Sequence, residues 1–209
     1  MTEHSTEDPR PRAVLLDLGG VVIDIDVRPL FAHWARAAGV TPEHVMSRWG
    51  ADAEYRRHET GHLDFAGYTK HLQQRLGIDM HADDWLSGWN SIFIGPFPSV
   101  AALLPQLAAR FDLCLYSNTN DAHHAEWAKR FPETLAPFRR RYVSSAIGRR
   151  KPDVESFRWV AADMGYAPGE ILFVDDTLEN IEGATAAGLR AVHARGDAAV
   201  GKLLADLLR

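Results

Sequence analysis

Residues 13–26, AVLLDLGGVVIDID, join an apolar run to an acid, two glycines and a second apolar run. The run AVLL at 13–16 is short and unbroken, which is typical of a strand buried on both faces. Asp17 stands at the end of this predicted strand. Gly19 and Gly20 follow, and glycine permits both close backbone approach and positive φ angles. The stretch therefore predicts a core strand that carries a carboxylate at its tip and then turns tightly.

Similar apolar runs recur along the chain and alternate with helical patterns. The runs are residues 113–116, 171–174, 191–192 with their neighbours, and a weaker one around Val143. Apolar residues recur at helical spacing in the segments 99–111, 153–165 and 177–188. Alternating strands and helices predict parallel strands joined by right-handed crossovers. We therefore expect an α/β fold whose core is a Rossmann-like three-layer sandwich with a parallel sheet.

Residues 27–97 interrupt this alternation, because no strand is evident there. The pattern predicts four helices, at residues 29–39, 41–50, 64–77 and 81–93. Thr41 and Asp64 are typical helix-start residues. We predict an inserted helical cap over residues 27–97 and a core formed by residues 11–26 and 98–209. The insertion is either a lid over the strand ends or additional helical packing, and its own core is expected to contain Trp34, Trp49, Trp85 and Trp89.

The composition is that of a globular protein with a slight acidic excess. Hydrophobic residues make up 46% of the 209 residues, and the formal net charge of −5 gives no overall bias toward nucleic acid. No apolar run reaches the roughly 18–20 residues of a membrane span, and residues 1–12 resemble a frayed tail rather than a secretory signal. The single cysteine, Cys114, excludes an intrachain disulfide and is expected to be core packing, so we expect a cytoplasmic protein. The arginines of residues 138–151 are expected to be solvated surface, as are His123 and His124.

Polar side chains follow the predicted strands where the strands end. They are Asp17, Ser117 with Asn118, Asp175 with Asp176, and Lys151 after the weaker strand. In an open parallel sheet, ligands bind beyond the carboxyl ends of the strands, so these side chains are expected to converge. Each aspartate alone is better explained as a turn or cap residue, but clustered carboxylates repel one another. A cation such as Mg²⁺ removes this conflict, and Ser117 and Lys151 suit a phosphate dianion.

Four segments, in this order, resemble the motifs of the haloacid dehalogenase-like (HAD) hydrolase superfamily. LLDLGGVV resembles a strand that ends in a nucleophilic Asp, and LYSNTN a strand that ends in Ser or Thr. GRRKP carries the motif Lys, and FVDDTLENIEGA resembles the acidic pair that follows a strand. The helical insertion predicted at residues 27–97 is similar to the cap that many members carry between the first two motifs. Within the superfamily, the chain resembles a sugar-phosphate phosphatase subgroup typified by α-D-glucose-1-phosphate phosphatase.

This resemblance implies Mg²⁺-dependent hydrolysis of a small phosphomonoester, such as a sugar phosphate. Asp17 would attack phosphorus and form an aspartyl-phosphate, which water then hydrolyses. Lys151 would act with Asp17 in catalysis by balancing the charge of the transferring group. The implied phosphate-binding residues are Ser117, Asn118 and Lys151. The implied Mg²⁺ ligands are Asp17, the carbonyl of Gly19, Asp176 and, directly or through water, Asp175.

Gly19 departs from the usual family pattern. Most family phosphatases carry a second Asp at this position, which protonates the leaving alcohol and later activates water. General acid–base help of this kind contributes roughly 10²–10⁴-fold to a rate, and a glycine cannot supply it. Either another group substitutes, with Asp24 and Asp26 the nearest in the chain, or water does, or the reaction is slow.

Two other functions stay open at this point. A haloacid dehalogenase-type hydrolase also uses an Asp nucleophile but needs no metal, so the pair Asp175–Asp176 argues against it. A non-catalytic binding or regulatory protein on the same scaffold is suggested only by Gly19. The sequence names neither the physiological substrate nor the oligomeric state.

Overall fold

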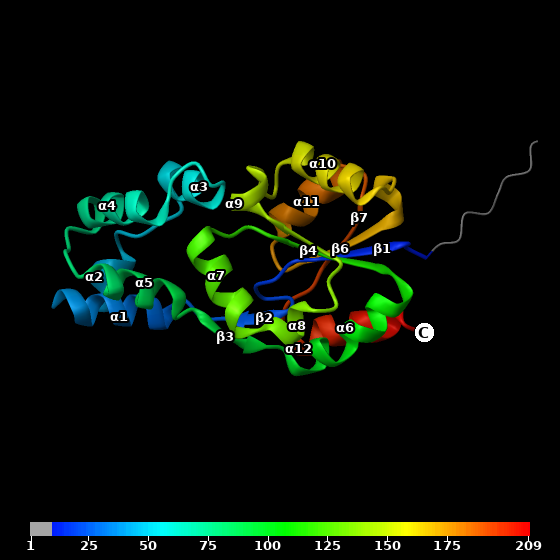
Figure 1. Cartoon of the computed structure of the whole chain (residues 1–209), viewed down its shortest axis with the longest axis horizontal. Coiled ribbons are helices and arrows are strands. Elements are labelled where there is room, and N and C mark those ends of the chain that lie inside the picture. The colour runs from blue at the N-terminus through cyan, green and yellow to red at the C-terminus, as the bar shows by residue number, and fades with distance from the viewer. Residues whose placement is uncertain (1–9) are drawn as a thin grey trace, which may run out of the picture.

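The computed structural model describes residues 10–209 and has a five-stranded parallel sheet at its centre (Figure 1). The strand order is β5–β4–β1–β6–β7, and β1 pairs in parallel with both β4 and β6. The strands are β1 (Ala13–Leu16), β4 (Asp112–Ser117), β5 (Arg140–Val143), β6 (Ile171–Asp175) and β7 (Arg190–His193). The parallel sheet of the predicted α/β fold is therefore confirmed, and the weaker run around Val143 is one of its edge strands.

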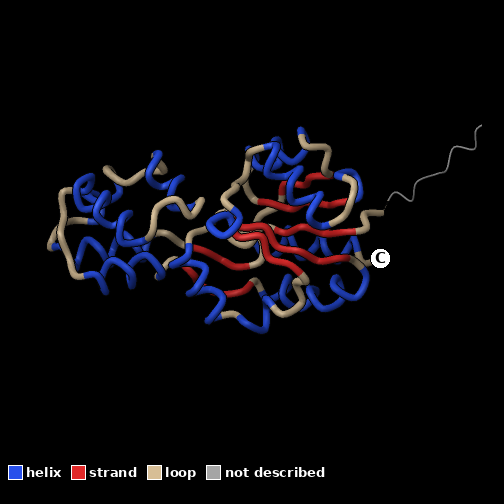
Figure 2. The backbone as a smooth tube through the Cα atoms, turned by 45° about the horizontal axis from the view of Figure 1, so that its top comes forward, coloured by secondary structure: helices blue, strands red, loops and turns tan. Residues whose placement is uncertain are grey.

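Helices cover both faces of this sheet and complete three layers (Figures 1 and 2). Val14 and Leu16 pack on one face, against α6 (Pro98–Arg110), α7 (Asp121–Arg130) and α12 (Gly196–Leu207). Ala13 and Leu15 pack on the other face, against α10 (Val154–Met164) and α11 (Leu178–Ala186). This double coverage explains why the strands read as unbroken apolar runs. Cys114 is buried in the second of these clusters, as predicted.

Short elements complete the connections: α8 (Pro132–Leu135), α9 (Ser144–Ile147) and the 3₁₀ helix η1 (Pro168–Glu170). Across residues 10–209, no helix combines the length and the apolar composition that crossing a membrane requires. The frayed tail expected at residues 1–12 falls mostly outside the described residues.

Five helices between residues 28 and 90 form what we call the helical block, at one end of the molecule (Figure 1). They pack around an apolar cluster of their own, in which Trp34, Trp85 and Trp89 are buried and Trp49 is partly buried. One of them was not predicted, because its sequence AEYRRHE shows little apolar periodicity; the side chain of Asp52 caps its N-terminus. The helices are α1 (Arg28–Ala38), α2 (Pro42–Met46), α3 (Ala53–Glu59), α4 (Phe65–Leu76) and α5 (Ala82–Asn90).

The chain enters and leaves the helical block through a two-stranded antiparallel ribbon. β2 (Ile23–Ile25) pairs with β3 (Phe93–Pro96). β3 lies within residues 27–97, where no strand was expected. Both strands are only three or four residues long, so their pattern is too short to predict. Because the ribbon joins both ends of the insertion, it fixes the helical block over the side of the sheet that holds Asp17.

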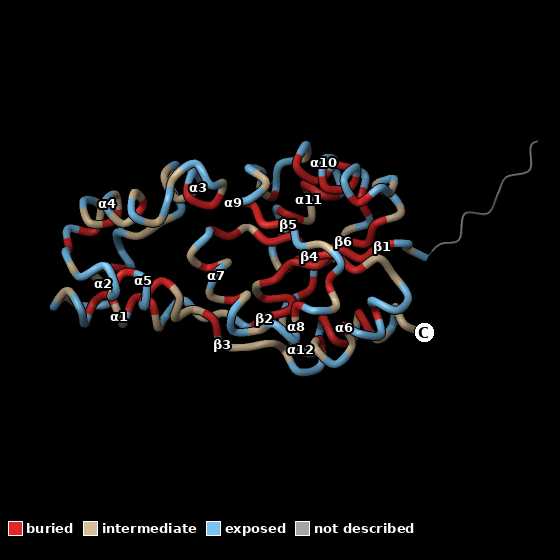
Figure 3. Tube along the Cα trace, in the orientation of Figure 1, coloured by how far each residue is buried: buried red, intermediate tan, exposed pale blue. Residues whose placement is uncertain are grey.

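His123 of α7 connects the core to the helical block and is buried (Figure 3 shows α7 between the two). Its ring stacks on Trp89 with centroids 4.6 Å apart, and Nε2 lies 2.8 Å from the Trp89 carbonyl. The amide nitrogen of Asn120 lies 3.3 Å from Nδ1, which assigns the proton to Nε2 and makes the ring neutral. The expectation that His123 lies on a helix surface is therefore wrong, because α7 turns this side toward α5.

The stability of the protein is expected to decrease in acid through His123. Burial lowers the pKa of His123 to about 3 in the folded chain, from an ordinary value of 6.5. Between these values unfolding takes up a proton, so stability present above pH 6.5 is lost as the pH falls. His123→Gln should reduce the slope of the free energy of unfolding against pH by about 1.4 kcal/mol per pH unit within this window. Urea unfolding between pH 6 and pH 4 would measure this slope. His62→Gln, at an exposed site, should keep the wild-type slope; equal slopes in all three proteins would contradict the assignment.

Gly183 of α11 sets how closely this helix approaches the segment that carries Lys151. A Cβ at Gly183 would overlap the carbonyl oxygen of Pro152, which belongs to the backbone and cannot rotate away. Gly183→Ala should therefore destabilise the protein by about 1–3 kcal/mol in chemical denaturation, although alanine normally favours a helix. Gly169→Ala, where a Cβ meets nothing within 4 Å, is the control and should cost little. A stabilised Gly183→Ala variant would show that the two segments are not in close contact.

Candidate active site

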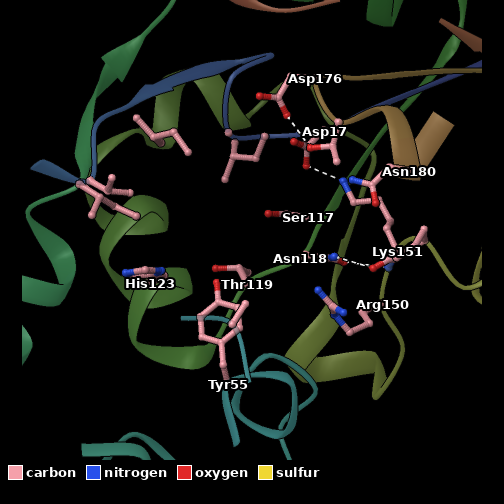
Figure 4. Close-up of a pocket in the computed structure, with 18 of the residues that line it drawn as sticks. Asp17, Tyr55, Ser117, Asn118, Thr119, His123, Arg150, Lys151, Asp176 and Asn180 are labelled. Atoms are coloured by element: carbon pink, nitrogen blue, oxygen red, sulfur yellow. Dashed lines mark hydrogen bonds and ion pairs between the residues drawn. The ribbon is translucent and has the colours of Figure 1, made fainter. Parts of the chain in front are cut away.

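The carboxyl edge of the sheet opens into a cavity of about 630 Å³ between the core and the helical block. Asp17 lies there at the end of β1, Ser117 and Asn118 at the end of β4, and Asp176 after β6 (Figure 4). Lys151 reaches the same place from the loop before α10. The structure thus brings together the polar residues that follow separate strands. A volume of this size is typical of sites for small molecules.

Lys151 is the centre of the buried charge. Its side chain is only 1% exposed, and its ammonium lies 2.6 Å from both Asp17 Oδ1 and Asp175 Oδ2. Its third donor reaches the carbonyl of Tyr116 at 2.9 Å. All three ammonium protons therefore have acceptors, and Lys151 holds the Asp17 carboxylate in place.

Burial and charge oppose each other in this cluster. Burial raises the pKa of Asp17 to about 7, although the attraction of the Lys151 ammonium offsets part of that effect. Burial alone would lower the pKa of Lys151, but the two carboxylates outweigh it and raise the pKa above its usual value. The ammonium consequently stays charged and offsets part of the cost of burying the Asp17 carboxylate.

Asn118 holds the backbone at Lys151. Its amide nitrogen donates to the Lys151 carbonyl at 2.8 Å, and its amide oxygen accepts from the Lys151 N–H at 2.9 Å. Both ends of the Asn118 side chain are therefore occupied by the backbone that presents the lysine. Ser117 differs, because its hydroxyl has no partner within residues 10–209 and points into the cavity (Figure 4).

Asp175 is fully buried and held on every side. Asn180 donates to both of its oxygens at 3.0 Å, and the Thr177 N–H donates to Oδ1 at 2.8 Å. Together with Lys151, these bonds occupy both carboxylate oxygens of Asp175. The geometry therefore makes Asp175 an anchor for Lys151, and Asn180 a support for that anchor.

The turn after β1 approaches Asp176 closely. Gly20 has a φ of +77°, and a Cβ there would overlap the Asp176 carboxylate, so only glycine fits both the backbone and the space. Gly19 has an ordinary φ, and a Cβ at that position would lie 3.1 Å from Ile25 Cδ1. Of the two glycines, Gly20 is thus the one that the turn requires.

The carboxylates of Asp17, Asp175 and Asp176 fit a divalent cation. Oxygens from all three lie within 4.8 Å of one another, and a single buried ammonium faces them. Three carboxylates and one ammonium leave the cluster with excess negative charge. Burial, and then the charge of Asp175, raise the pKa of Asp176. The Nε of Arg195 lies 3.6 Å from Asp176 Oδ2, and because this side chain is largely exposed it balances little of the excess negative charge. Hard carboxylate oxygens of this kind are the ligands that Mg²⁺ prefers.

The helical block supplies the wall of the cavity opposite Asp176. Tyr55 and Arg56 come from α3, and Arg150 comes from the core beside Lys151 (Figure 4 labels Tyr55 and Arg150). Glu59 of α3 pairs with Arg150 at 2.9 Å and is buried. Tyr55 was not identified in the sequence, because nothing in the pattern of α3 indicates which side chains face the core. The expectation that Arg150 is solvated surface is wrong, because this side chain lines the cavity and pairs with Glu59.

Other nearby charges do not line the cavity. Asp24 is exposed, and Asp26 pairs with Arg28 at 2.7 Å, so neither nearby acid belongs to the described wall. Arg149 lies over the Trp159 ring, 5.6 Å from its centroid, and is not part of the described cavity wall. Nearness in the chain to Asp17 or to Lys151 is therefore not sufficient to place a side chain in the cavity wall.

Known proteins resemble this chain over most of its length. D-Ribitol-5-phosphate phosphatase of Bacteroides thetaiotaomicron is 24% identical over 178 residues, which cover 80% of this chain and 84% of that protein. A HAD family enzyme of the same organism, solved with magnesium and inorganic phosphate, superposes with a TM-score of 0.77 at 24% identity over 89% and 95% of the two chains. The structure of a predicted HAD-like family hydrolase from Porphyromonas gingivalis gives a TM-score of 0.82 at 20% identity over 95% and 98% of the two chains. The structural matches show a shared fold.

The sequence of residues 11–188 matches the family model of the haloacid dehalogenase-like hydrolases. This match includes all four segments whose polar residues meet in the cavity, together with the helical block between the first and the second. The chain therefore belongs to the haloacid dehalogenase-like hydrolase family.

Proposed function

We propose that this protein is a Mg²⁺-dependent phosphatase that hydrolyses a small phosphomonoester through an aspartyl-phosphate on Asp17. The observation that carries the proposal is the contact of Lys151 with Asp17 at 2.6 Å, inside a cavity that also holds Asp176. A relative over most of the chain is a named phosphatase of a polyol phosphate. A small sugar or polyol phosphate suits the cavity volume and the hydroxyl and guanidinium groups of its wall.

Asp17 is the nucleophile in this proposal. One of its oxygens attacks phosphorus while the ester P–O bond breaks on the opposite side. Lys151 orients the carboxylate and balances the charge that gathers around the transferring group. The unpartnered hydroxyl of Ser117 binds a phosphate oxygen, and Asn118 keeps the lysine segment in position.

Asp17, Asp176 and the carbonyl of Gly19 would hold Mg²⁺, with Asp175 acting through water or through Lys151. When bound, the ion would neutralise phosphate charge and polarise a phosphoryl oxygen. Asp176 also favours a phosphatase over a dehalogenase, because attack on a haloacid carbon gives this second, partly exposed carboxylate no role.

Replacing the nucleophile should abolish turnover. Asp17→Asn is expected to reduce the hydrolysis of p-nitrophenyl phosphate in the presence of Mg²⁺ by about 10³-fold or more. Asp24→Asn, an equally conservative change at an exposed acid outside the cavity, is the control and should retain wild-type activity. Turnover that survives in Asp17→Asn would exclude the nucleophile, and chloride release from a haloacid in EDTA would favour a dehalogenase.

Mg²⁺ should bind through Asp176 and raise the stability of the folded chain. At a concentration 100 times its Kd, the ion should stabilise the wild type by about 2.7 kcal/mol, which thermal unfolding with increasing MgCl₂ would detect. Asp176→Asn should lose most of this shift, and Asp24→Asn should keep it. An equal shift in all three proteins would place the ion elsewhere.

A further inference from the structure

Neither of the two acids that follow Gly19 most closely in the chain, Asp24 and Asp26, lines the cavity. Ile25 Cδ1 fills the space beside Gly19 toward which a longer side chain would extend. Asp24 alternates with Ile25 on β2 and is exposed, and Asp26 is held by Arg28. A side chain that exchanges protons with the leaving alcohol therefore has to come from another part of the cavity wall.

The cationic side chains of the wall do not meet this need. Arg56 and Arg150 keep their protons at all ordinary pH values, because a guanidinium is too weak an acid to release one. Lys151 donates its three hydrogen bonds to Asp17, Asp175 and the carbonyl of Tyr116. Its role is fixed by these contacts.

The two neutral titratable side chains of the wall, His123 and Tyr55, are also not free to exchange protons with a substrate. His123 donates from Nε2 to the Trp89 carbonyl and accepts at Nδ1 from Asn120, so both ring nitrogens are engaged. Tyr55 holds its proton tightly, because burial and then the charge of Glu59 raise its pKa well above the usual value. Neither ring can both give and take a proton during one turnover.

Glu179 lies in the first turn of α11, between Thr177 and Asn180, which both hold Asp175. It is the only carboxylate of the described cavity wall besides Asp17 and Asp176. Its side chain is exposed to solvent and has no hydrogen-bond or ion-pair partner among the residues that the structure describes. Figure 4 shows Asp176 and Asn180, the residues that flank this turn, on the same side of the cavity as Asp17.

We propose that Glu179 is the general acid and base that replaces the side chain missing at Gly19. This inference rests on the proposed function. As Asp17 attacks and the ester P–O bond breaks, the leaving oxygen takes the proton of the Glu179 carboxyl group, and the alcohol departs. The Glu179 carboxylate then removes a proton from a water molecule. That water attacks phosphorus, the P–O bond to Asp17 breaks, and inorganic phosphate and the free Asp17 carboxylate are released.

The dependence of the rate on the leaving group tests this role. Phenyl phosphate and p-nitrophenyl phosphate are similar in size, but phenolate is the more basic leaving group and needs a proton more. In Glu179→Gln, kcat/KM should fall by about 10²-fold for phenyl phosphate and by less than about threefold for p-nitrophenyl phosphate. Because kcat/KM reports the steps up to the formation of the aspartyl-phosphate, slower hydrolysis of that intermediate does not affect the comparison.

Two further variants make the result specific. Glu182→Gln changes an exposed acid one turn further along α11, outside the described cavity wall, and should leave both substrates unaffected. Glu179→Asp retains a carboxyl group and should recover part of the lost rate with phenyl phosphate. Equal effects of Glu179→Gln on both substrates, including no effect on either, would overturn the assignment of Glu179 alone. A wild-type protein that hydrolyses neither substrate with Mg²⁺ would overturn the proposed function and this inference with it.

Discussion

The buried ammonium of Lys151 is the interaction on which the site depends. Carboxylates from two different strand ends, Asp17 and Asp175, can lie together in the interior only because a positive charge lies between them. Removing the ammonium would leave two uncompensated carboxylates in the interior, which is strongly destabilising. The same contacts that make the cluster tolerable also aim the Asp17 carboxylate at the cavity. Stability and chemistry are therefore linked through one side chain.

Residues around this cluster hold its three charged groups in place. Asn118 binds the backbone at Lys151 from one side, and Gly183 lets α11 approach Pro152 from the other. Asn180 fixes Asp175, which in turn fixes the ammonium. A preorganised charge needs no reorganisation during the reaction, and this is the main source of electrostatic catalysis. The packing of α11 is thus part of the functional site although most of its residues touch no substrate.

The helical block gives the cavity its second half. It has its own apolar core, but the stacked pair Trp89 and His123 and the ion pair between Glu59 and Arg150 attach it to the sheet domain. As a result, the end of the cavity that holds Asp17 and Ser117 is built by strand ends, and the opposite end is built by α3. A fold of this kind can change its substrate through one wall while the other keeps its chemistry. The Arg56 and Tyr55 side of the cavity is where selectivity for the leaving group would be decided.

The sequence alone determined the parallel sheet, because strands covered on both faces must be apolar throughout, and it determined which polar residues end those strands. It also indicated the family, since the motifs keep their order and local spacing. It did not reveal α3 or the ribbon of β2 and β3, whose short segments depend on partners distant in the chain. Only the tertiary structure decided that His123 is buried, that Gly20 rather than Gly19 meets Asp176, and that Glu179 rather than Asp24 faces the cavity. Each of these depends on which side of an element meets a neighbour across space, and local sequence carries no record of that neighbour.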